Sequence, residues 1–587
     1  MKLKQLLLMA FAATASAVSA QRMVVDTSKY VDYVDNTNYD WSLMKWQGDR
    51  PMPGSKNAVP FAAAGSYNEM SDEEVQNRTD LPAFVNAANT VWFPPVFNQD
   101  NGSCGSASRI CYMLTYELNA YYDRPGNILE NQLPSHFVWN LTYGNSGKDE
   151  FIQFVGVPSA KAYGGRTSSS VYGSYDWDSP LTGWMSGYDK WYEGFFNRAH
   201  KPSNFPVSMK YAAGRKALKS WLYDHNGDPD FKGRPAVVGI GVASANGDAP
   251  IANTPANAEA GVVGKRYLTN WGLQVDHALT IVGYDDRIEF DLDGDGVYGE
   301  GDLETDEPWG PQPLEKGAWI VVNSWGPWWA NAGFIYCPYA WSVPNAVDNN
   351  GHLSPSDGWW MPEVYRIRKD YAPMRTIKIE MEYSRRSEVA LSVGIAADVN
   401  ATAPEKTIPM HHFQYAGDGQ NGATNPAPEV PMLGQWNDGK LHHEPMEFGY
   451  DVTDLTEGYD RTRPLKYFFI INRKRNSRLG HGQLHNLAIV DYETSATGME
   501  TPFVLTEENC KIDSAGADQI VYSTIVYGAS TTYAPENLGA AKQTLSWTAP
   551  LKSANVLKGY NIYCEGTLEA TVEPNVLTYE AQKSGEY

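Results

Sequence analysis

Hydrophobic and polar positions along the chain repeat with two different periods. Residues 109–120 (RICYMLTYELNA) place apolar side chains every three to four positions, which predicts an amphipathic helix. Two further helices are expected, at 133–139, where a proline stands near the first turn, and at 212–224. Apolar, β-branched runs predict strands at 236–242, 275–284, 317–326 and 333–336.

The pattern changes after about residue 371. Residues 376–383 (TIKIEMEY) alternate between apolar and polar with a period of two, which is typical of a half-buried strand. Similar short runs predict more strands at 389–395, 467–471 and 487–490. We therefore expect an all-β, sandwich-like domain over 371–505.

The remainder of the chain reads as a linker followed by a small β module. Residues 506–533 are expected to be a linker with some strand character. Residues 545–550 (LSWTAP) and 559–563 (GYNIY) resemble strands of a fibronectin type III module. We expect that module, at 534–587, to be incomplete because such a sandwich needs about 100 residues.

The N-terminus has the composition of an export signal. Lys2 and Lys4 precede an apolar run at 6–17, and the small residues at 18–20 form a cleavage pattern, so residues 1–20 are predicted to be a signal peptide. We interpret residues 21–80, which are polar and weakly periodic, as a pro-segment or an irregular extension. The expected location is secreted, either extracellular or associated with the cell surface.

Composition narrows the classes of partner. The 587 residues carry a net charge of −22 and no long run of Lys or Arg, which argues against nucleic acid. No apolar run is long enough for an integral membrane segment. Five cysteines are too few for a disulfide scaffold, and because their number is odd, at least one thiol is expected to be free or paired between chains.

One cysteine stands where a reactive thiol is favoured. Gln99 precedes a Gly/Ser-rich turn, and Cys104 follows at the start of the predicted helix. The positive end of a helix dipole favours the thiolate, which is the reactive form of cysteine. A nucleophilic thiol also needs a base and a group that orients this base. His277 and Asn323, which could serve as such a base and orienting group, lie in two of the predicted strands and follow Cys104 in the chain.

At these residues the chain resembles the papain family of cysteine peptidases, over about 81–345. The similar segments are Gln99 with the Cys104 helix, residues 276–284 (DHALTIVGY) and residues 323–326 (NSWG). Supporting similarity lies at 81–85 (LPAFV) and 133–137 (LPSHF). The resemblance implies an α+β fold, in which a two-lobed papain-like peptidase domain (81–370) is followed by all-β domains.

The resemblance also implies roles for single residues. His277 would be the general base, Asn323 would orient its imidazole, and Gln99 would donate its amide to the oxyanion. Trp325 would shield the Asn–His hydrogen bond and border the substrate. Gly164 and Gly165 resemble the glycine-rich segment that binds the substrate backbone. The expected partner is a protein or peptide substrate, with surface or adhesive contacts assigned to the β domains.

The sequence departs from the family at the nucleophile. A literal alignment of residues 102–108 (GSCGSAS) puts Ala107 where the family has its reactive cysteine. This register predicts an inactive pseudopeptidase that binds peptides or surfaces. The other register makes Cys104 the nucleophile and needs one residue fewer after Gln99. A shift of three residues keeps the same helix face buried, so both registers remain open.

A second group of side chains suggests a metal. Residues 291–302 (DLDGDGVYGEGD) follow the pattern of a calcium loop, inserted between the strands of His277 and Asn323. The predicted structural Ca²⁺ would have no part in the chemistry, for which no cofactor is expected. Its predicted ligands are Asp291, Asp293, Asp295, the Val297 carbonyl and Asp302.

Overall fold

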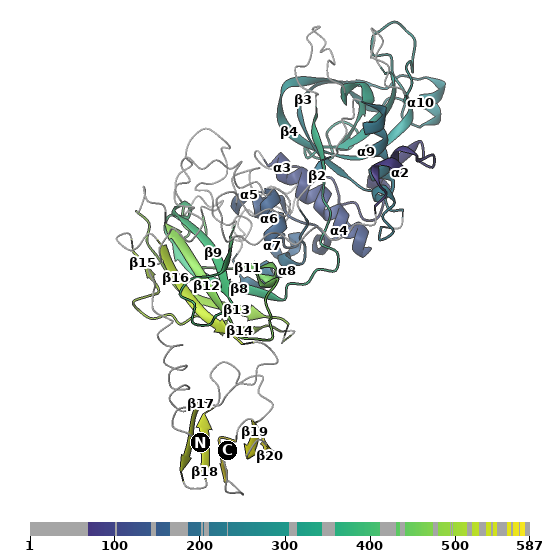
Figure 1. Cartoon of the computed structure of the whole chain (residues 1–587). Helices are drawn as coiled ribbons and strands as arrows, with labels where there is room; N and C mark the ends of the chain where they lie inside the picture. Colours follow the sequence, from purple (N-terminus) through teal and green to yellow (C-terminus); the bar gives the residue numbers. More distant parts are fainter. Residues whose placement is uncertain are drawn as a thin grey trace.

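The computed structural model describes most of the chain between Glu69 and Glu580 (Figure 1). The described residues are 69–99, 103–141, 148–164, 186–200, 203–204, 211–231, 233–304, 314–342, 359–410, 430–434, 441–473, 479–493, 495, 497–513, 519–527, 536–541, 544–548, 560–564, 567–573 and 576–580. The expected signal peptide at 1–20 and the first part of the expected pro-segment, 21–68, lie outside these ranges.

Helices occupy much of the first part of the chain. They are α2 (Asp72–Gln76), α3 (Cys104–Ser106), η4 (Ala107–Leu114), α4 (Thr115–Tyr122), α5 (Ser135–Leu141), α6 (Lys148–Phe154), α7 (Ala160–Tyr163), α8 (Tyr188–Phe195), α9 (Ala212–Asp224) and α10 (Pro255–Glu259). Single 3₁₀ turns are η3 (Ala87–Asn89), η5 (Leu129–Asn131), η6 (His225–Gly227), η7 (Tyr339–Ser342), η8 (Arg386–Glu388) and η9 (Thr453–Thr456). The helices predicted at 133–139 and 212–224 are confirmed as α5 and α9.

A seven-stranded sheet carries two of the predicted site residues. Its strands are β1 (Phe84–Asn86), β2 (Ser203–Asn204), β3 (Val238–Pro250), β4 (Arg266–Glu289), β5 (Lys316–Val322), β6 (Phe334–Pro338) and β7 (Trp359–Val364). The strand order is β2-β7-β3-β4-β5-β6, and β1 also pairs with β4. His277 lies within β4, whereas Asn323 directly follows β5. The four strands predicted in this region are therefore confirmed.

Helices cover this sheet on both faces. On one face, a buried cluster joins Trp221 of α9 to Ile281 of β4. On the other, the helix that begins at Cys104 packs against β3 and β4, and its Ile110 shares a buried cluster with Val282. Neighbouring positions of β4 thus face opposite helices, as the alternation of a strand requires. This packing holds the Cys104 helix close to the strand of His277.

The described strands between Arg375 and Val526 form two antiparallel sheets (Figure 1). One has the order β10-β9-β12-β16, from β9 (Val389–Ala396), β10 (Lys406–Pro409), β12 (Leu465–Arg473) and β16 (Gln519–Val526). The other has the order β11-β8-β13-β14, with β15 paired to β13, from β8 (Arg375–Tyr383), β11 (Met446–Asp451), β13 (Gly482–Asp491), β14 (Met499–Pro502) and β15 (Lys511–Ile512). The strands predicted here are confirmed.

The expected linker at 506–533, for which some strand character was predicted, contains a long strand. Its residues 519–526 form β16, which pairs with β12 from Leu465↔Val526 to Asn472↔Gln519. Seven of the eight β16 residues, in the run QIVYSTIV, are buried, and Ile520 is fully buried. This segment is therefore part of the β region, which extends past the expected boundary at residue 505.

The last described strands form two small sheets. One contains β17 (Glu536–Ala541), β18 (Thr544–Thr548) and β21 (Thr578–Glu580), and the other contains β19 (Tyr560–Cys564) and β20 (Thr567–Val572). Leu545, Tyr560 and Ile562 form their shared apolar cluster. Together the helices and sheets make the chain α+β, as predicted. Within the described residues, every helix is too short or too polar to cross a membrane.

Candidate active site

Cys104 begins a continuous helical stretch that ends at Tyr122. The first turn is α3, the next eight residues are the π-helical η4, and α4 completes the stretch. Thr115 Oγ1 donates a hydrogen bond to the Ile110 carbonyl, five residues earlier, at 2.9 Å. The predicted helix at 109–120 is thus confirmed, but its first half has the wider π turn. Such turns are rare and often lie at functional sites.

His277 and Asn323 meet where strands β4 and β5 run side by side. Thr280 pairs with Val322, so Asn323 comes next to the segment of β4 that carries His277. Asn323 Oδ1 accepts hydrogen bonds from His277 Nε2 at 2.8 Å and from the Ser324 amide at 2.7 Å. Because the backbone amide fixes which atom of the Asn323 side chain is the acceptor, His277 Nε2 must be the donor. The imidazole is therefore held in one orientation.

The Cys104 thiol hydrogen-bonds to His277 on the other side of the imidazole. Since Nε2 is bonded to Asn323, Nδ1 is the ring nitrogen that remains for the sulfur. Burial, the largest single influence, raises the pKa of the thiol, but the hydrogen bond and the charge of His277 outweigh it. Backbone amides at Ala278 and Gly105 add to this effect, and the pKa of Cys104 lies below its usual 9.0. The environment thus favours the thiolate.

Trp325 covers the imidazole. Its ring stacks on His277 with the centroids 4.8 Å apart and the planes 28° apart. His277 is 9% exposed and Asn323 is 2% exposed, so the hydrogen bond between them lies away from water. A low local dielectric strengthens such a bond. The shielding position expected for Trp325 agrees with this geometry.

Gln99 is fixed beside the same residues. Its backbone N–H donates a hydrogen bond to the Ser324 carbonyl at 2.6 Å, and its side-chain Oε1 accepts one from Ser324 Oγ at 2.6 Å. Asn98 and Trp325 also form a β-bridge. Because Oε1 is the acceptor for Ser324, the orientation of the Gln99 side-chain amide is set. The segment before Cys104 is therefore tied to the segment after β5.

Sequence reasoning missed the residues that brace this arrangement. Ser108 Oγ lies 2.8 Å from Thr280 Oγ1 and donates to the Leu279 carbonyl at 2.6 Å, which joins the helix of Cys104 to β4. Tyr112 OH donates to the Asn323 carbonyl at 3.0 Å. Thr280 is a polar side chain among the apolar residues of 278–282 (ALTIV), and this was the only signal in the sequence for any of the three.

The remaining predicted substrate residues are only partly described. Gly164 ends α7 with φ of 97°, a left-handed conformation that glycine adopts without strain. Gly165 lies outside the described residues. Ala107, the residue that the literal alignment put in the nucleophile position, is fully buried in the first turn of η4. The hydrogen bond to His277 comes from Cys104.

The predicted calcium loop brings together a different set of carboxylates from the one expected. Asp291, Asp293 and Glu315 place one oxygen each within 4.8 Å of one another, and so do Asp293, Asp295 and Glu300. Asp302 belongs to neither of these groups, and its Oδ1 accepts from the Glu304 amide at 2.9 Å. Neither Glu300 nor Glu315 was predicted as a ligand.

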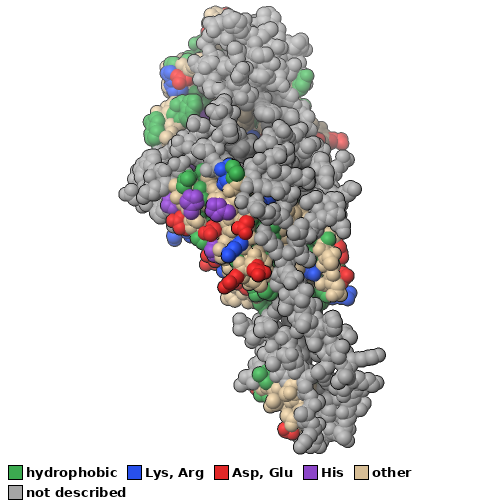
Figure 2. Space-filling model, turned by 90° about the vertical axis from the view of Figure 1, so that its left-hand side faces the viewer, with side chains coloured by type: hydrophobic (Ala, Val, Ile, Leu, Met, Phe, Trp, Pro, Cys, Tyr) green, Lys and Arg blue, Asp and Glu red, His purple; other side chains and the backbone are tan. Residues whose placement is uncertain are grey.

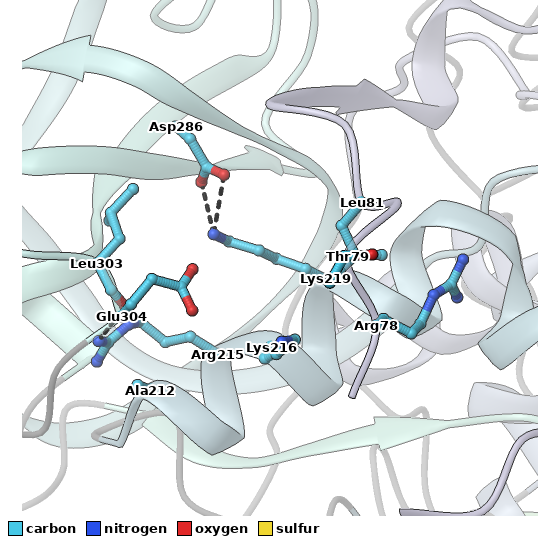
Figure 3. Close-up of a pocket in the computed structure, with 10 residues that line it drawn as sticks. All are labelled: Arg78, Thr79, Leu81, Ala212, Arg215, Lys216, Lys219, Asp286, Leu303 and Glu304. Atoms are coloured by element: carbon cyan, nitrogen blue, oxygen red, sulfur yellow. Dashed lines mark hydrogen bonds and ion pairs between the residues drawn. The ribbon is translucent and has the colours of Figure 1, made fainter. Parts of the chain in front are cut away.

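A separate polar cavity lies between α9 and the end of the loop (Figure 3). It has a volume of about 280 Å³ and is lined by Arg78, Thr79, Leu81, Ala212, Arg215, Lys216, Lys219, Asp286, Leu303 and Glu304. Lys219 forms an ion pair with Asp286 at 2.8 Å, and Arg215 Nη2 donates to the Leu303 carbonyl. None of the residues predicted to act in catalysis lines this cavity.

Histidines also gather beside acidic side chains on one face of the molecule (Figure 2). Among the described residues, His442 Nδ1 lies 3.4 Å from Glu444, and His485 Nε2 lies 3.7 Å from Glu382. Neither histidine belongs to the groups of candidate metal ligands found among the described residues.

Comparison with known proteins finds no match at the level of sequence and only weak similarity to solved structures. No protein-family model and no curated protein matches the sequence. Similar solved structures are papain-like cysteine proteases. Xylellain from Xylella fastidiosa is 16% identical, with a TM-score of 0.30 over 53% of this chain and 95% of its own. Procathepsin L 3 of Tenebrio molitor is 13% identical, with a TM-score of 0.28 over 62% and 88%.

Bromelain from Ananas comosus, in complex with the E64 inhibitor, is 16% identical, with a TM-score of 0.26 over 49% of this chain and 100% of its own. These low scores do not establish family membership. The geometry of the site itself therefore has to support any functional assignment.

Proposed function

We propose that the chain is a papain-like cysteine peptidase that hydrolyses peptide bonds through a thioester. The observation that supports this most directly is the hydrogen-bonded series Cys104–His277–Asn323. It contains a thiol with a lowered pKa, a base in contact with it and an amide that orients the base. These are the three parts that a nucleophilic thiol mechanism needs.

The roles follow from the atoms that face one another. The Cys104 thiolate attacks the carbonyl carbon of the substrate, while the proton resides on His277 Nδ1. When the tetrahedral intermediate collapses, the C–N bond breaks and Nδ1 gives its proton to the departing amine. Water, activated by the now neutral His277, then attacks the thioester and releases the acid and the thiol. Throughout, Asn323 Oδ1 holds Nε2–H and limits rotation of the ring.

The oxyanion would be stabilised at the start of the helix. The Cys104 backbone N–H and the Gln99 side-chain amide are the proposed donors. This role is supported by the contact between Gln99 Oε1 and Ser324 Oγ, because an amide whose oxygen is fixed presents its nitrogen in a fixed direction. Trp325, Gly164 and Gly165 remain the proposed neighbours of the substrate.

A second proposal, an inactive pseudopeptidase that binds peptides or surfaces, also has support. Ala107 occupies the position of the reactive cysteine in the literal alignment, and Cys104 is only 8% exposed. We prefer the active enzyme, because a thiol without a catalytic role has no need for an imidazole that is oriented by Asn323 and covered by Trp325.

We also propose the setting in which the enzyme works. The signal sequence at 1–20 would direct export, and residues 21–80 would be a pro-segment or an extension. The peptidase region would have two lobes, and the two sheets of 371–526 would pack as a sandwich followed by the fibronectin type III-like module. Surface or adhesive contacts would belong to these β regions.

Proteolysis of casein by the purified full chain tests the main proposal. The Cys104→Ala variant should lose cleavage to the level of the buffer control. Cys510→Ala, which changes a buried cysteine outside the site, should keep it. If Cys104→Ala cleaves casein as fast as the Cys510→Ala control, Cys104 is not the nucleophile. If the wild-type chain cleaves no peptide but binds peptides, the pseudopeptidase is favoured.

A further inference from the structure

Five carboxylates converge at the loop between β4 and β5. Asp291, Asp293 and Asp295 come from the loop itself, Glu300 from its end, and Glu315 from the residue just before β5. Their oxygens form the two overlapping groups described above, which share Asp293. Loop backbone amides already bond Asp291 and Asp293: Gly294 N–H donates to Asp291 Oδ1 at 2.7 Å, and Asp295 N–H donates to Asp293 Oδ1 at 3.1 Å.

The burial of Glu315 distinguishes this cluster from an ordinary acidic turn on the surface. Its side chain is fully buried, and its Oε1 accepts from the amides of Leu292 and Asp293. Its Oε2 is buried and has no hydrogen-bond partner among the residues that the structure describes. Glu300 Oε2 is likewise buried without a partner in this part of the chain. A buried carboxylate oxygen without a donor is costly, so both oxygens call for a ligand that is not part of the chain.

A cation is the kind of ligand that satisfies them. Within the described part of the chain, none of the five carboxylates forms an ion pair with Lys, Arg or His. Oxygen atoms of carboxylates at this spacing repel one another unless a positive charge lies between them. Ca²⁺, which takes six to eight oxygen ligands, fits such a set better than Mg²⁺, which usually keeps several of its water ligands.

We propose that this cluster binds one Ca²⁺ through Asp291, Asp293, Asp295, Glu300 and Glu315. Among the carboxylates, the proposal differs from the sequence pattern at the last position. Glu315, from the entrance to β5, and Glu300 supply the charge that Asp302 was expected to supply. The ion thus connects the loop to a residue outside the loop, rather than closing the loop on itself.

The position of Glu315 gives the ion a structural effect beyond the loop. Its amide donates to the Glu300 carbonyl at 2.9 Å, and its carbonyl accepts from Phe290 N–H at 2.8 Å. It directly precedes β5, whose last residue is followed by Asn323. Bound Ca²⁺ therefore fixes the start of the strand that ends at the proposed active site. The metal site itself does not depend on peptidase activity.

Calorimetric titration of the full chain with CaCl₂, after removal of metal with EGTA, tests the proposal. The wild-type chain should bind one equivalent, and its melting temperature should rise in CaCl₂ relative to EGTA. Glu315→Gln and Asp295→Asn should each weaken binding at least about tenfold, since each removes a charged ligand. Asp302→Asn, the matched control within the same loop, should bind within about twofold of the wild type.

Two features keep the test decisive. Without metal, Glu315→Gln should melt no lower than the wild type, because it removes repulsion. If that variant nevertheless fails to fold, Asp295→Asn, which changes an exposed side chain, answers the same question. Absence of binding to the wild type at millimolar CaCl₂ would overturn the site. Loss of binding in Asp302→Asn but not in Glu315→Gln would overturn the ligand set in favour of the sequence pattern.

Discussion

Replacing His277 by Phe isolates the electrostatic effect of the imidazole on Cys104. Phenylalanine keeps an aromatic ring where His277 stacks on Trp325, and it keeps water out of the site. It removes the charge and the hydrogen bond that lower the pKa of the thiol. Asn323 Oδ1 keeps one of its two hydrogen-bond donors, the Ser324 backbone amide, so this buried oxygen still accepts a hydrogen bond.

Opposing influences on the pKa of the Cys104 thiol determine the direction in which His277→Phe shifts it. Burial raises the pKa of Cys104, and the contacts with His277 bring it below the usual 9.0. Once those contacts are removed, burial dominates and the pKa rises above its wild-type value. Two unit charges about 4 Å apart interact by about 4 kcal/mol at an effective dielectric constant of 20. Even if only part of this energy acts on the thiolate in the wild type, its loss in His277→Phe lowers the fraction of thiolate at pH 7 by about 10- to 100-fold.

The rate of alkylation by iodoacetamide, measured against pH, reports this change. In the wild type, the rate should reach its plateau at a lower pH than for an ordinary thiol. In His277→Phe, it should be lower at pH 7 by about 10- to 100-fold and should still rise above pH 9. Cys104→Ala supplies the background from the other cysteines. An unchanged profile in His277→Phe would refute the assigned contact between the sulfur and the imidazole.

Two further outcomes are expected elsewhere in the chain. Gln99→Ala should lower kcat for a peptide substrate by about 10²- to 10³-fold with little change in KM, because it removes one donor to the oxyanion; a fall confined to KM would contradict this role. Burial raises the pKa of the Asp454 carboxyl, but Arg198 and Arg368 outweigh it and hold that pKa below its usual 3.8. A carboxyl group whose pKa is lower in the folded than in the unfolded state stabilises the fold at a pH above its unfolded pKa, and this stabilisation is lost as the pH falls. The melting temperature of the wild type should therefore exceed that of Asp454→Asn above about pH 4. The difference between the two should shrink as the pH is lowered below about 4. A constant difference down to pH 2 would contradict that account.

Much of the secondary structure was predictable, because local periodicity determined it. Residues 278–282 and 318–322 are buried on both faces of the sheet, with neighbouring side chains in two different clusters, so their apolar runs are continuous and easy to recognise. β16 was harder to assign because it follows a stretch without clear periodicity, and its partner β12 lies about fifty residues earlier. Pairing over that separation leaves no local signal.

The site was predictable in part for a similar reason. His277 and Asn323 were recognised from short motifs, but which turn of the helix would meet His277 depends on the helix geometry. The π-helical η4 winds residues 107–114 more widely than an α-helix, and nothing in their composition predicts it. The bracing contacts of Ser108 and Tyr112 depend on this same winding.

The ligands of the acidic loop show the limit of pattern matching. The sequence motif assigned its last position to Asp302, because the spacing within one loop is all that a motif contains. Glu315 lies thirteen residues further along and reaches the loop only because β5 begins there. Long-range placement of this kind has to come from the folded chain.

Covalent labelling of the purified chain by an epoxysuccinyl thiol inhibitor tests the central claim most directly. Peptide mapping by mass spectrometry should find one adduct per chain, on Cys104, and the adduct should disappear in His277→Phe at pH 7 while casein cleavage is lost in parallel. An unlabelled Cys104 in a folded wild-type chain, or labelling that is equally fast without His277, would contradict the assignment of a Cys104–His277 nucleophile.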